Sequence, residues 1–587
     1  MLIGSMRLQS GDEPNRDDWR NTLICCACLL LCVVIAHPFG AIAFGDDWAY
    51  ADVALKFART ARIQYNGWGG APVLFQTIWA APWIRIFGFS FDLLRYISLP
   101  FSVGFVALSY LTGRCAGLRP NLALFGGITI ATSPLFVPLA ATFMTEAYAL
   151  CFGILAIYAA LRSMKSPRRG GATFWLWVVG VSGLIGGADR QVDWIAPIFL
   201  ISWLAWLRRA DRRFVVAAAV CWGCCALSIA AMTRFFSQPY APLELAKTEP
   251  ISLIARNSVS MVAIILCALM AGVTTILPAL VCFISKWRCL KLSTLGLLVV
   301  ISVLFAAFLF KVAVSEVGER LGLFPYVASI VTHVGPAQGS MRGERPQIMT
   351  RDFRRFMSVA CSFVLIASAW VVIRQPSLRR DMRRNPDYAV FAIFSAIYLI
   401  LLLPGALIGA TFDRYVLPLV PIMAIIGLHA FQHFGREIPA AAWGCLALFG
   451  CYAVATTHDY ASSLRARAAT AEALIAAGIP RDHVSGGFEY DGWTQVQKLS
   501  YMHVRIDGER LGQHEDCWFW FWDHATAVTP DYVELYGLPS SSGDSRLPRR
   551  DFVAWLPPFR RSIVAWKRSD LDRTCRPTEG PTGGKLR

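Results

Sequence analysis

Long apolar segments recur along most of the chain, and this feature limits its fold more than any other. Crossing a bilayer takes about 20 mostly apolar residues, and thirteen segments approach this length. They are residues 21–40, 90–112, 122–139, 143–161, 173–188, 193–207, 214–235, 259–285, 292–314, 356–373, 388–410, 414–434 and 439–457. Charged residues make up only 16% of the 587 residues, against about 25% in soluble proteins. The sequence therefore predicts an all-α polytopic membrane protein with about 13 transmembrane helices.

The positions of the Lys and Arg residues explain the formal net charge of +17. These residues gather in alternate short loops between the predicted spans, as at 162–169, 208–213, 286–291 and 374–384. Because such loops usually face the cytoplasm, we predict a cytoplasmic N-terminus and, after an odd number of spans, an extracytoplasmic C-terminus. The polar tail, 459–587, has 17 basic and 17 acidic residues and adds nothing to the surplus. The charge therefore indicates membrane topology rather than a nucleic-acid partner.

The chain divides into two predicted domains. Residues 1–458 form the membrane domain, with long outer loops at 43–89, 236–258 and 315–355, and residues 459–587 form a small extracytoplasmic α+β domain. Loops of this length between membrane spans are usually functional or disordered. Residues that carry chemistry are therefore expected at the outer ends of the spans.

Two features leave alternatives open. Ala41-Ile42-Ala43 resembles a signal-peptide cleavage site, although we expect the first helix to remain uncleaved. Most of the 17 cysteines lie in apolar segments, where cysteine packs as a small hydrophobic residue. Cys517 and Cys575 lie in the polar tail, and they could form one disulfide if the tail is exported.

Two adjacent carboxylates, Asp46 and Asp47, directly follow the first predicted span. Their mutual repulsion and partial burial would raise a pKa, which suits a general base or a cation site. The alternative is a solvated helix N-cap, because Asp is favoured there.

Three more charged positions lie at the outer ends of other spans. Glu146 is near the start of the fourth span, Arg190 is in the short connection between the fifth and sixth spans, and Asp413-Arg414 opens the twelfth. An ionisable group at membrane depth is a functional candidate, and Arg is a preferred partner for phosphate. The alternatives are a Glu that favours a helix start, an Asp–Arg pair that neutralises a turn, and an interfacial anchor. Together the positions predict one outer cavity for an anionic phosphate substrate and a proton-accepting carboxylate.

Further motifs lie along the same part of the chain. They are Gly67-Trp68-Gly69-Gly70, Phe87-Gly88, Arg95, and Arg414-Tyr415 with Pro418 and Pro421. The acidic pair, the glycine-containing loop, the Phe-Gly turn, the Arg in the second helix and the late R-Y-x-x-P-x-x-P signature resemble the GT-C membrane glycosyltransferases. The nearest branch holds aminoarabinose transferases of lipid A, protein O-mannosyltransferases and rhizobial lipopolysaccharide glycosyltransferases. The resemblance covers about residues 1–434, with Glu146 at the family's second acidic position.

The resemblance implies a GT-C-like fold in the bacterial inner membrane and a polyprenyl-phosphate-linked sugar as donor. An acceptor hydroxyl of a glycolipid, polysaccharide or protein would attack the anomeric carbon at the extracytoplasmic face. By this analogy Asp46 is the general base, Asp47 supports it, and Glu146 orients a substrate or acts as a second base. The residues expected at the leaving phosphate are Arg190, Arg414, Lys56 and Arg59. Those expected to contact substrate are Tyr50, Gln191, Asp413 and Tyr415.

Two points qualify the expected chemistry. The first loop has no D-x-D motif, so we expect no required cofactor or metal, although Asp46, Asp47 and Asp52 could bind a divalent cation. Glu146 replaces the commoner Asp and moves its carboxylate by one methylene.

A lipid or glycan transporter or flippase is the alternative function, and a non-catalytic scaffold is a third. The sequence favours the enzyme because it shows no inverted repeat and its charges gather at one face.

Overall fold

The structure is a computed structural model. It describes residues 16–194, 196–235, 258–317, 329–337, 339–343, 345–407, 411–435, 437–502, 519–537 and 547–574. Parts of three sequence predictions fall outside these ranges: residues 236–257 of the second outer loop, residues 318–328 of the third outer loop, and both Cys517 and Cys575.

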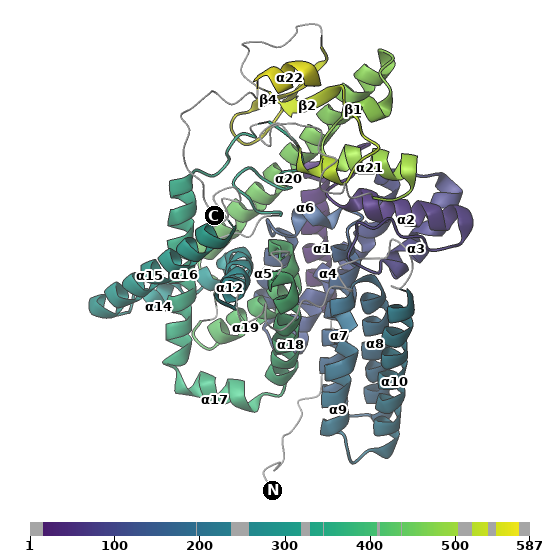
Figure 1. Ribbon diagram of the computed structural model, residues 1–587. Helices are drawn as coiled ribbons and strands as arrows, with labels where there is room; N and C mark the ends of the chain where they lie inside the picture. Colours follow the sequence, from purple (N-terminus) through teal and green to yellow (C-terminus); the bar gives the residue numbers. More distant parts are fainter. Residues whose placement is uncertain are drawn as a thin grey trace.

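A bundle of α-helices forms the first three quarters of the chain (Figure 1). Its helices are α1 (Arg16–Ala36), α2 (Asp47–Thr60), α3 (Leu74–Phe87), α4 (Phe91–Cys115), α5 (Pro120–Ala131), α6 (Val137–Ala140), α7 (Thr145–Lys165), α8 (Arg169–Asp189), α9 (Ile201–Leu207), α10 (Arg212–Phe235), α12 (Ser258–Thr275), α13 (Leu277–Val281), α14 (Ile284–Trp287), α15 (Leu292–Val317), α16 (Arg351–Ile373), α17 (Pro376–Arg384), α18 (Asp387–Leu407) and α19 (Val420–Gln432). Short 3-10 helices at Gln191–Trp194 (η1) and Asp413–Leu419 (η5) and a π-helix at Ala196–Leu200 (η2) interrupt the series.

Each of the thirteen predicted spans contains helix, but their lengths differ from the prediction. Among the described residues, nine helices are long and apolar enough to cross a membrane, or ten if the bent pair of α17 and α18 is one span. The remaining three predicted spans contain shorter apolar helices, at Pro120–Ala131, Gln191–Leu207 and Ile265–Thr275. Proline accounts for two of these differences, because Pro134 follows α5 and Pro197 lies within the segment that includes η2. The predicted class, an all-α polytopic membrane protein with a small C-terminal sheet, is confirmed.

The first outer loop folds into two helices rather than remaining irregular. α2 and α3 pack against each other and extend from the bundle (Figure 1). Tyr50 of α2 lies against Gly69, where a Cβ atom would come within 2.7 Å of the tyrosine ring. Glycine is therefore required for the close approach of the Gly67–Gly70 loop to α2.

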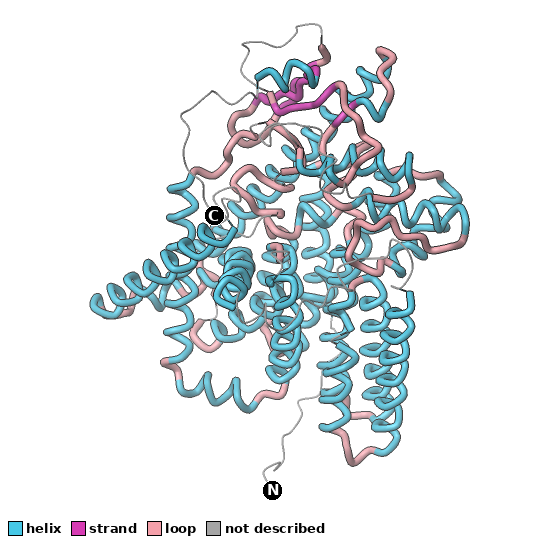
Figure 2. Tube along the Cα trace, viewed as in Figure 1, coloured by secondary structure: helices cyan, strands magenta, loops and turns pink. Residues whose placement is uncertain are grey.

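The C-terminal part is built on one long helix, α20 (Ala440–Ala476), which runs without a break for 37 residues. It is followed by β1 (Val484–Ser485), α21 (Phe488–Leu499), β2 (Tyr532–Tyr536), β3 (Arg549–Val553), β4 (Arg560–Lys567) and α22 (Arg568–Thr574). The sheet has the order β1-β2-β4-β3, with β1 parallel to β2 and the other pairs antiparallel (Figure 2). The predicted domain boundary at residue 459 falls inside α20.

Buried polar contacts join the C-terminal part to the outer loops. Arg467 of α20 pairs with Glu489 of α21 across 2.9 Å, and both side chains are buried. The loop before α16 meets this unit twice: Phe488 N donates to Ser340 O (2.7 Å), and Tyr536 N donates to Arg342 O (3.3 Å). The third predicted outer loop is therefore part of the same outer layer.

Two of the basic segments lie at the other end of the bundle. α17 and the turn between α9 and α10 are farthest from the C-terminal sheet in Figure 1. They include the Arg-rich sequences at 374–384 and 208–213. This arrangement separates the basic end of the bundle from the end that carries the sheet.

Candidate functional site

Four charged side chains form an alternating chain at the end of the bundle that faces the C-terminal part. Arg414 Nη2 donates to Asp46 Oδ2 at 3.1 Å, and Arg414 Nε lies 3.5 Å from Glu146 Oε1. Arg190 Nη1 donates to the same Oε1 atom at 3.3 Å. The order is therefore Asp46, Arg414, Glu146, Arg190, with each Arg beside at least one carboxylate. We call these residues the charge relay cluster.

Each member of the charge relay cluster lies at the end of a different element. Asp46 is the N-cap of α2, Glu146 is in the first turn of α7, Arg190 is the C-cap of α8, and Arg414 is in η5. The first turn of a helix stabilises a carboxylate through the helix dipole, which suits Glu146. The antiparallel order of α7 and α8 then brings Arg190 back to the same level. Four of the predicted residues therefore meet at one place.

The charge relay cluster is largely removed from water. The Glu146 side chain is only 2% exposed, Arg414 is 11% exposed and Arg190 is 13% exposed. Two carboxylates and two guanidinium groups leave no net charge, and a buried charge without a partner would be strongly unfavourable. Both guanidinium groups approach Oε1 of Glu146, whereas its buried Oε2 has no hydrogen-bond partner in the described part of the chain. Glu146 therefore retains one acceptor atom for a further donor.

Asp47 is turned away from Asp46 into the protein. Its side chain is buried, Oδ2 accepts from Phe44 N at 3.3 Å, and Oδ1 has no hydrogen-bond partner among the described residues. Burial raises its pKa from 3.8 to about 7, while the positive charge of Arg95 acts in the opposite direction. Asp47 is therefore the carboxyl group at this turn whose protonation changes near neutral pH.

Arg95 of α4 holds the turn that carries the two Asp residues. Its buried guanidinium donates to Gly40 O at 2.7 Å and to Ile42 O at 2.5 Å, and it pairs with Asp92 at 2.9 Å. These bonds fix the chain between α1 and α2. Arg95 therefore positions the turn that carries Asp46 and Asp47.

Aromatic and amide side chains surround the two Arg residues. The Arg190 guanidinium lies over the Tyr415 ring at 4.7 Å, and the Arg414 guanidinium lies 5.7 Å from the same ring. Gln191 Nε2 donates to Gly70 O at 2.7 Å and so links the end of α8 to the glycine loop. Gln191 and Tyr415 therefore lie beside the charge relay cluster, and Tyr50 is near enough that the charges of Asp46, Arg414 and Glu146 act on its pKa, which burial raises.

Three other predicted residues have different partners. Lys56 Nζ donates to Asp52 Oδ2 at 2.6 Å and to Ser500 O, so it joins α2 to the C-terminal part. Arg59 is exposed near the end of α2. Asp413 is buried, and its carboxylate accepts from the backbone N–H groups of Ile330, Val331 and Arg414 at 2.7–3.2 Å. Asp413 therefore fixes the loop before α16 rather than joining the cluster.

An aromatic cluster beside Asp46 was not predicted from the sequence. Trp68 Nε1 donates to Asp46 Oδ1 at 2.9 Å. Its ring lies 5.2–6.4 Å from four aromatic rings of the C-terminal part: Phe488, Trp520, Phe521 and His524. Trp520 is 48% exposed. The dense aromatic run at residues 518–522 of an otherwise polar tail was the signal that could have found this surface.

The three first-loop carboxylates do not share one ligand position. Asp46 is bound by Arg414 and Trp68, Asp47 is buried behind the turn, and Asp52 accepts from Lys56 and Asn66. Their separate partners do not form a ready cation site.

One family model matches part of the chain. The description of that family is Dolichyl-phosphate-mannose-protein mannosyltransferase, and the match covers residues 69–188. This stretch contains Gly69 and Gly70 of the glycine loop, Arg95 and Glu146, and it ends just before Arg190. The match confirms the similarity to GT-C membrane glycosyltransferases that the sequence predicts. No curated protein sequence matches the chain significantly.

The chain also has weak likenesses to solved structures. ArnT from Cupriavidus metallidurans bound to undecaprenyl phosphate is 12% identical, with a TM-score of 0.45 over 94% of this chain and 98% of that one. The Pmt1-Pmt2 complex of S. cerevisiae, bound to the sugar donor, is 18% identical, with a TM-score of 0.33 over 40% of this chain. The oligosaccharyltransferase AglB from Archaeoglobus fulgidus is 14% identical, with a TM-score of 0.39. The matches span 35% of the Pmt chain and 56% of AglB.

Proposed function

We propose that this protein is a membrane glycosyltransferase that moves a sugar from a polyprenyl-phosphate donor to an acceptor hydroxyl. The observation that carries the proposal is the position of Arg414 between Asp46 and Glu146. One guanidinium group there contacts both carboxylates that could accept a proton. The reaction requires two things of the protein: a positively charged site for the donor phosphate and a carboxylate that acts as the base.

In our proposal, the donor phosphate displaces carboxylates from the guanidinium groups of the charge relay cluster. Arg binds phosphate oxygens in the same bidentate manner as carboxylates. A donor phosphate that engages Arg190 and Arg414 would compete with Glu146 and Asp46 for those guanidinium groups. Because a carboxylate that loses a positive partner becomes more basic, donor binding itself would activate the base.

The proposed reaction is a single substitution at the anomeric carbon. The acceptor oxygen forms a bond to that carbon while the bond from the carbon to the phosphate oxygen breaks. The acceptor proton passes to a carboxylate, for which Asp46 is our first choice, and the electron pair leaves with polyprenyl phosphate. Arg190 and Arg414 stabilise the leaving charge, a contribution that is often the largest in such sites.

We assign the reaction to the extracytoplasmic face of a bacterial inner membrane. The support is the opposite placement of the basic loops and the C-terminal sheet, since basic loops usually face the cytoplasm. A donor lipid would remain in the bilayer while its phosphate reaches the outer ends of α7 and α8. The acceptor would approach from the side of Trp68 and Trp520, where the aromatic rings offer flat apolar surfaces beside Asp46.

The direct test uses a deletion strain complemented with wild type, Asp46→Asn, or Glu437→Gln. Glu437 is an exposed carboxylate far along the chain and serves as a matched control. We expect the deletion and Asp46→Asn strains to accumulate one polyprenyl-phosphate sugar, detected by mass spectrometry of the lipid extract, and to lose one surface glycan. The Glu437→Gln strain should match wild type.

A second assay separates transfer from transport. Solubilised protein is mixed in detergent with the accumulated donor lipid and with envelope material from the deletion strain. An enzyme transfers the sugar without any membrane compartment, whereas a flippase does not. No transfer by wild-type protein in detergent, together with an unchanged glycan profile in the deletion strain, would overturn the proposal.

A further inference from the structure

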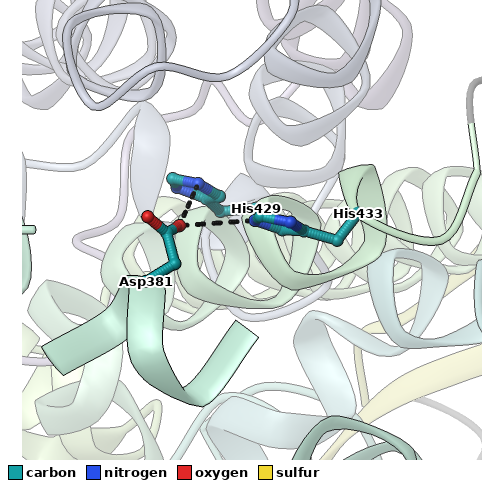
Figure 3. A group of neighbouring side chains, drawn as sticks. All are labelled: Asp381, His429 and His433. Atoms are coloured by element: carbon teal, nitrogen blue, oxygen red, sulfur yellow. Dashed lines mark ion pairs between the residues drawn. The ribbon is translucent and has the colours of Figure 1, made fainter. Parts of the chain in front are cut away.

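Two imidazole rings and one carboxylate meet near the basic end of the bundle, at the opposite end of α19 from Arg414. His433 Nε2 lies 3.4 Å from Asp381 Oδ2, and His429 Nε2 lies 3.8 Å from the same oxygen. Figure 3 shows both rings directed at the Asp381 carboxylate. The three possible ligand atoms all lie within 4.8 Å of one another.

Helix geometry explains why the two rings are neighbours. His429 and His433 are four residues apart on α19 and its C-cap, and residues at this spacing share one helix face. Their rings stack at 5.6 Å with an angle of 6° between the planes. Asp381 comes from a different element, α17, which lies across this face. A ligand held by all three would therefore join α17 to α19.

The distances suit a small divalent cation. Zinc binds imidazole nitrogen and carboxylate oxygen at about 2.0–2.2 Å, so tetrahedral ligand atoms lie roughly 3.3–3.5 Å apart. The distance from His433 to Asp381 already has this value, and the distance from His429 to Asp381 exceeds it by a few tenths of an ångström. A small side-chain rotation would close the difference, because the His433 side chain is 31% exposed and the Asp381 side chain is 41% exposed.

The ligand set also selects the class of ion. Two neutral imidazoles and one carboxylate favour zinc and related transition metals over magnesium or calcium, which prefer oxygen ligands. Three protein ligands leave a fourth position for water. The positive charge of the Arg residues of α17 disfavours a bound cation. The three ligand atoms would therefore bind the ion against the net charge at this end of the bundle.

We propose that Asp381, His429 and His433 bind one zinc-class divalent cation that fastens α17 to α19. The site lies outside the charge relay cluster and does not depend on the proposed function. α19 follows η5, the 3-10 helix that contains Arg414. The ion would therefore hold the far end of the segment that carries Arg414.

The test uses the full chain, purified in detergent without a polyhistidine tag. The protein is stripped with a chelator, dialysed against Zn²⁺ and analysed for bound metal, and Co²⁺ is used as an absorption probe of tetrahedral coordination. We expect about one Zn²⁺ per wild-type chain, and at least a tenfold weaker affinity in His433→Gln and His429→Gln, in line with the 10–100-fold effect of perturbing metal shells. The metal should also raise the unfolding temperature of wild type but not of these variants.

His483→Gln is the matched control, because His483 pairs with Asp531 at 2.7 Å and, among the described residues, is not part of a group of three possible metal ligands. Its metal content should equal that of wild type. The unfolding temperature without metal shows whether each variant folds. Equal zinc affinity in wild type and His433→Gln would overturn the proposal, and so would a wild-type chain that binds no zinc. Such equality would instead assign any bound metal to the cysteines.

Discussion

Arg414 donates a hydrogen bond to Asp46 across 3.1 Å, although 368 residues of chain separate them. This contact joins the start of α2 to the start of η5. Arg414 also lies beside Glu146 of α7, so the contact brings three elements together. A guanidinium group that contacts two carboxylates is a specific geometric requirement. It can be tested by substitutions that preserve charge but change shape.

Arg414→Lys should lower sugar transfer even though it keeps the positive charge. A Lys ammonium is a single compact charge and cannot contact Asp46 and Glu146 through separate nitrogens. We expect kcat/KM to fall by about 100-fold, in the range found when one stabilising donor of a catalytic site is removed. Steady-state kinetics with extracted donor lipid provide the measurement. Near-normal kcat/KM would show that only charge is needed.

Glu146→Gln should lose most of the transfer activity and lower the stability of the fold. The amide is nearly isosteric, yet it leaves Arg190 without the anionic partner that it has at 3.3 Å. We expect kcat to fall at least tenfold, because removal of a positioned acid or base typically costs about 10²–10⁴. Glu437→Gln controls for the loss of one carboxylate. Glu146→Asp should recover part of the rate, since it restores the charge.

Asp47 should make stability and activity depend on pH near neutrality. Burial raises its pKa from 3.8 to about 7, so the folded protein holds a proton that the unfolded chain releases. Stability should therefore fall as the pH rises from about 4 to 7, with the full penalty present above pH 7. Asp47→Asn should lack this part of the decline. Thermal unfolding in detergent from pH 4 to pH 8 compares the two slopes, and parallel curves would contradict this assignment.

Trp68→Phe should separate two functions of one side chain. The phenyl ring keeps the aromatic contacts with Phe488 and Phe521, but it cannot donate to Asp46 Oδ1. If that bond orients the base, kcat should fall several-fold while the acceptor KM changes little. Trp520→Ala should show the reverse pattern, because the exposed Trp520 ring contacts Trp68 rather than Asp46. The ratio of kcat to KM effects in the two variants is the measurement.

Asp413→Asn should loosen the outer loop more than it changes the charge of the site. The carboxylate accepts three backbone N–H groups, and an amide can accept with only one oxygen. Weakening bonds to a charged acceptor costs about 1.5–3 kcal/mol each. We expect a lower unfolding temperature and faster proteolysis near residues 329–334. An unchanged digestion pattern would argue against this anchoring role.

The membrane helices were predictable because each must satisfy one local requirement: sufficient apolar length. The same rule could not give the true lengths near Pro134 and Pro197, where the backbone leaves the regular helix. The meeting of Asp46, Glu146, Arg190 and Arg414 was also predictable in outline, because each lies at the same end of its span. Their pairwise order was not, since it depends on side-chain directions that no local pattern encodes.

Lys56 and Asp413 have tertiary partners that the sequence does not show. Lys56 is on the same helix as Asp47 and looked available to a phosphate, but the C-terminal part supplies Ser500 O and Asp52 competes for the charge. Asp413 precedes Arg414 in sequence, yet its carboxylate turns to a loop more than 80 residues earlier. Partners that arrive from distant parts of the chain decide such roles, and the sequence pattern does not include them.

The unbroken helix α20 has a mechanical consequence. Its 37 residues extend about 55 Å, whereas the hydrocarbon core of a bilayer takes about 30 Å. The remaining part of α20 is a rigid helical extension, so no flexible linker separates the sheet from the membrane. The sheet must rotate, tilt or rise together with the transmembrane part of α20. Insertion of a single residue into this part of α20 would rotate everything above it by about 100° and carry the aromatic cluster away from Asp46. Insertion of four residues would leave a net rotation of only about 40°, with a rise of about 6 Å.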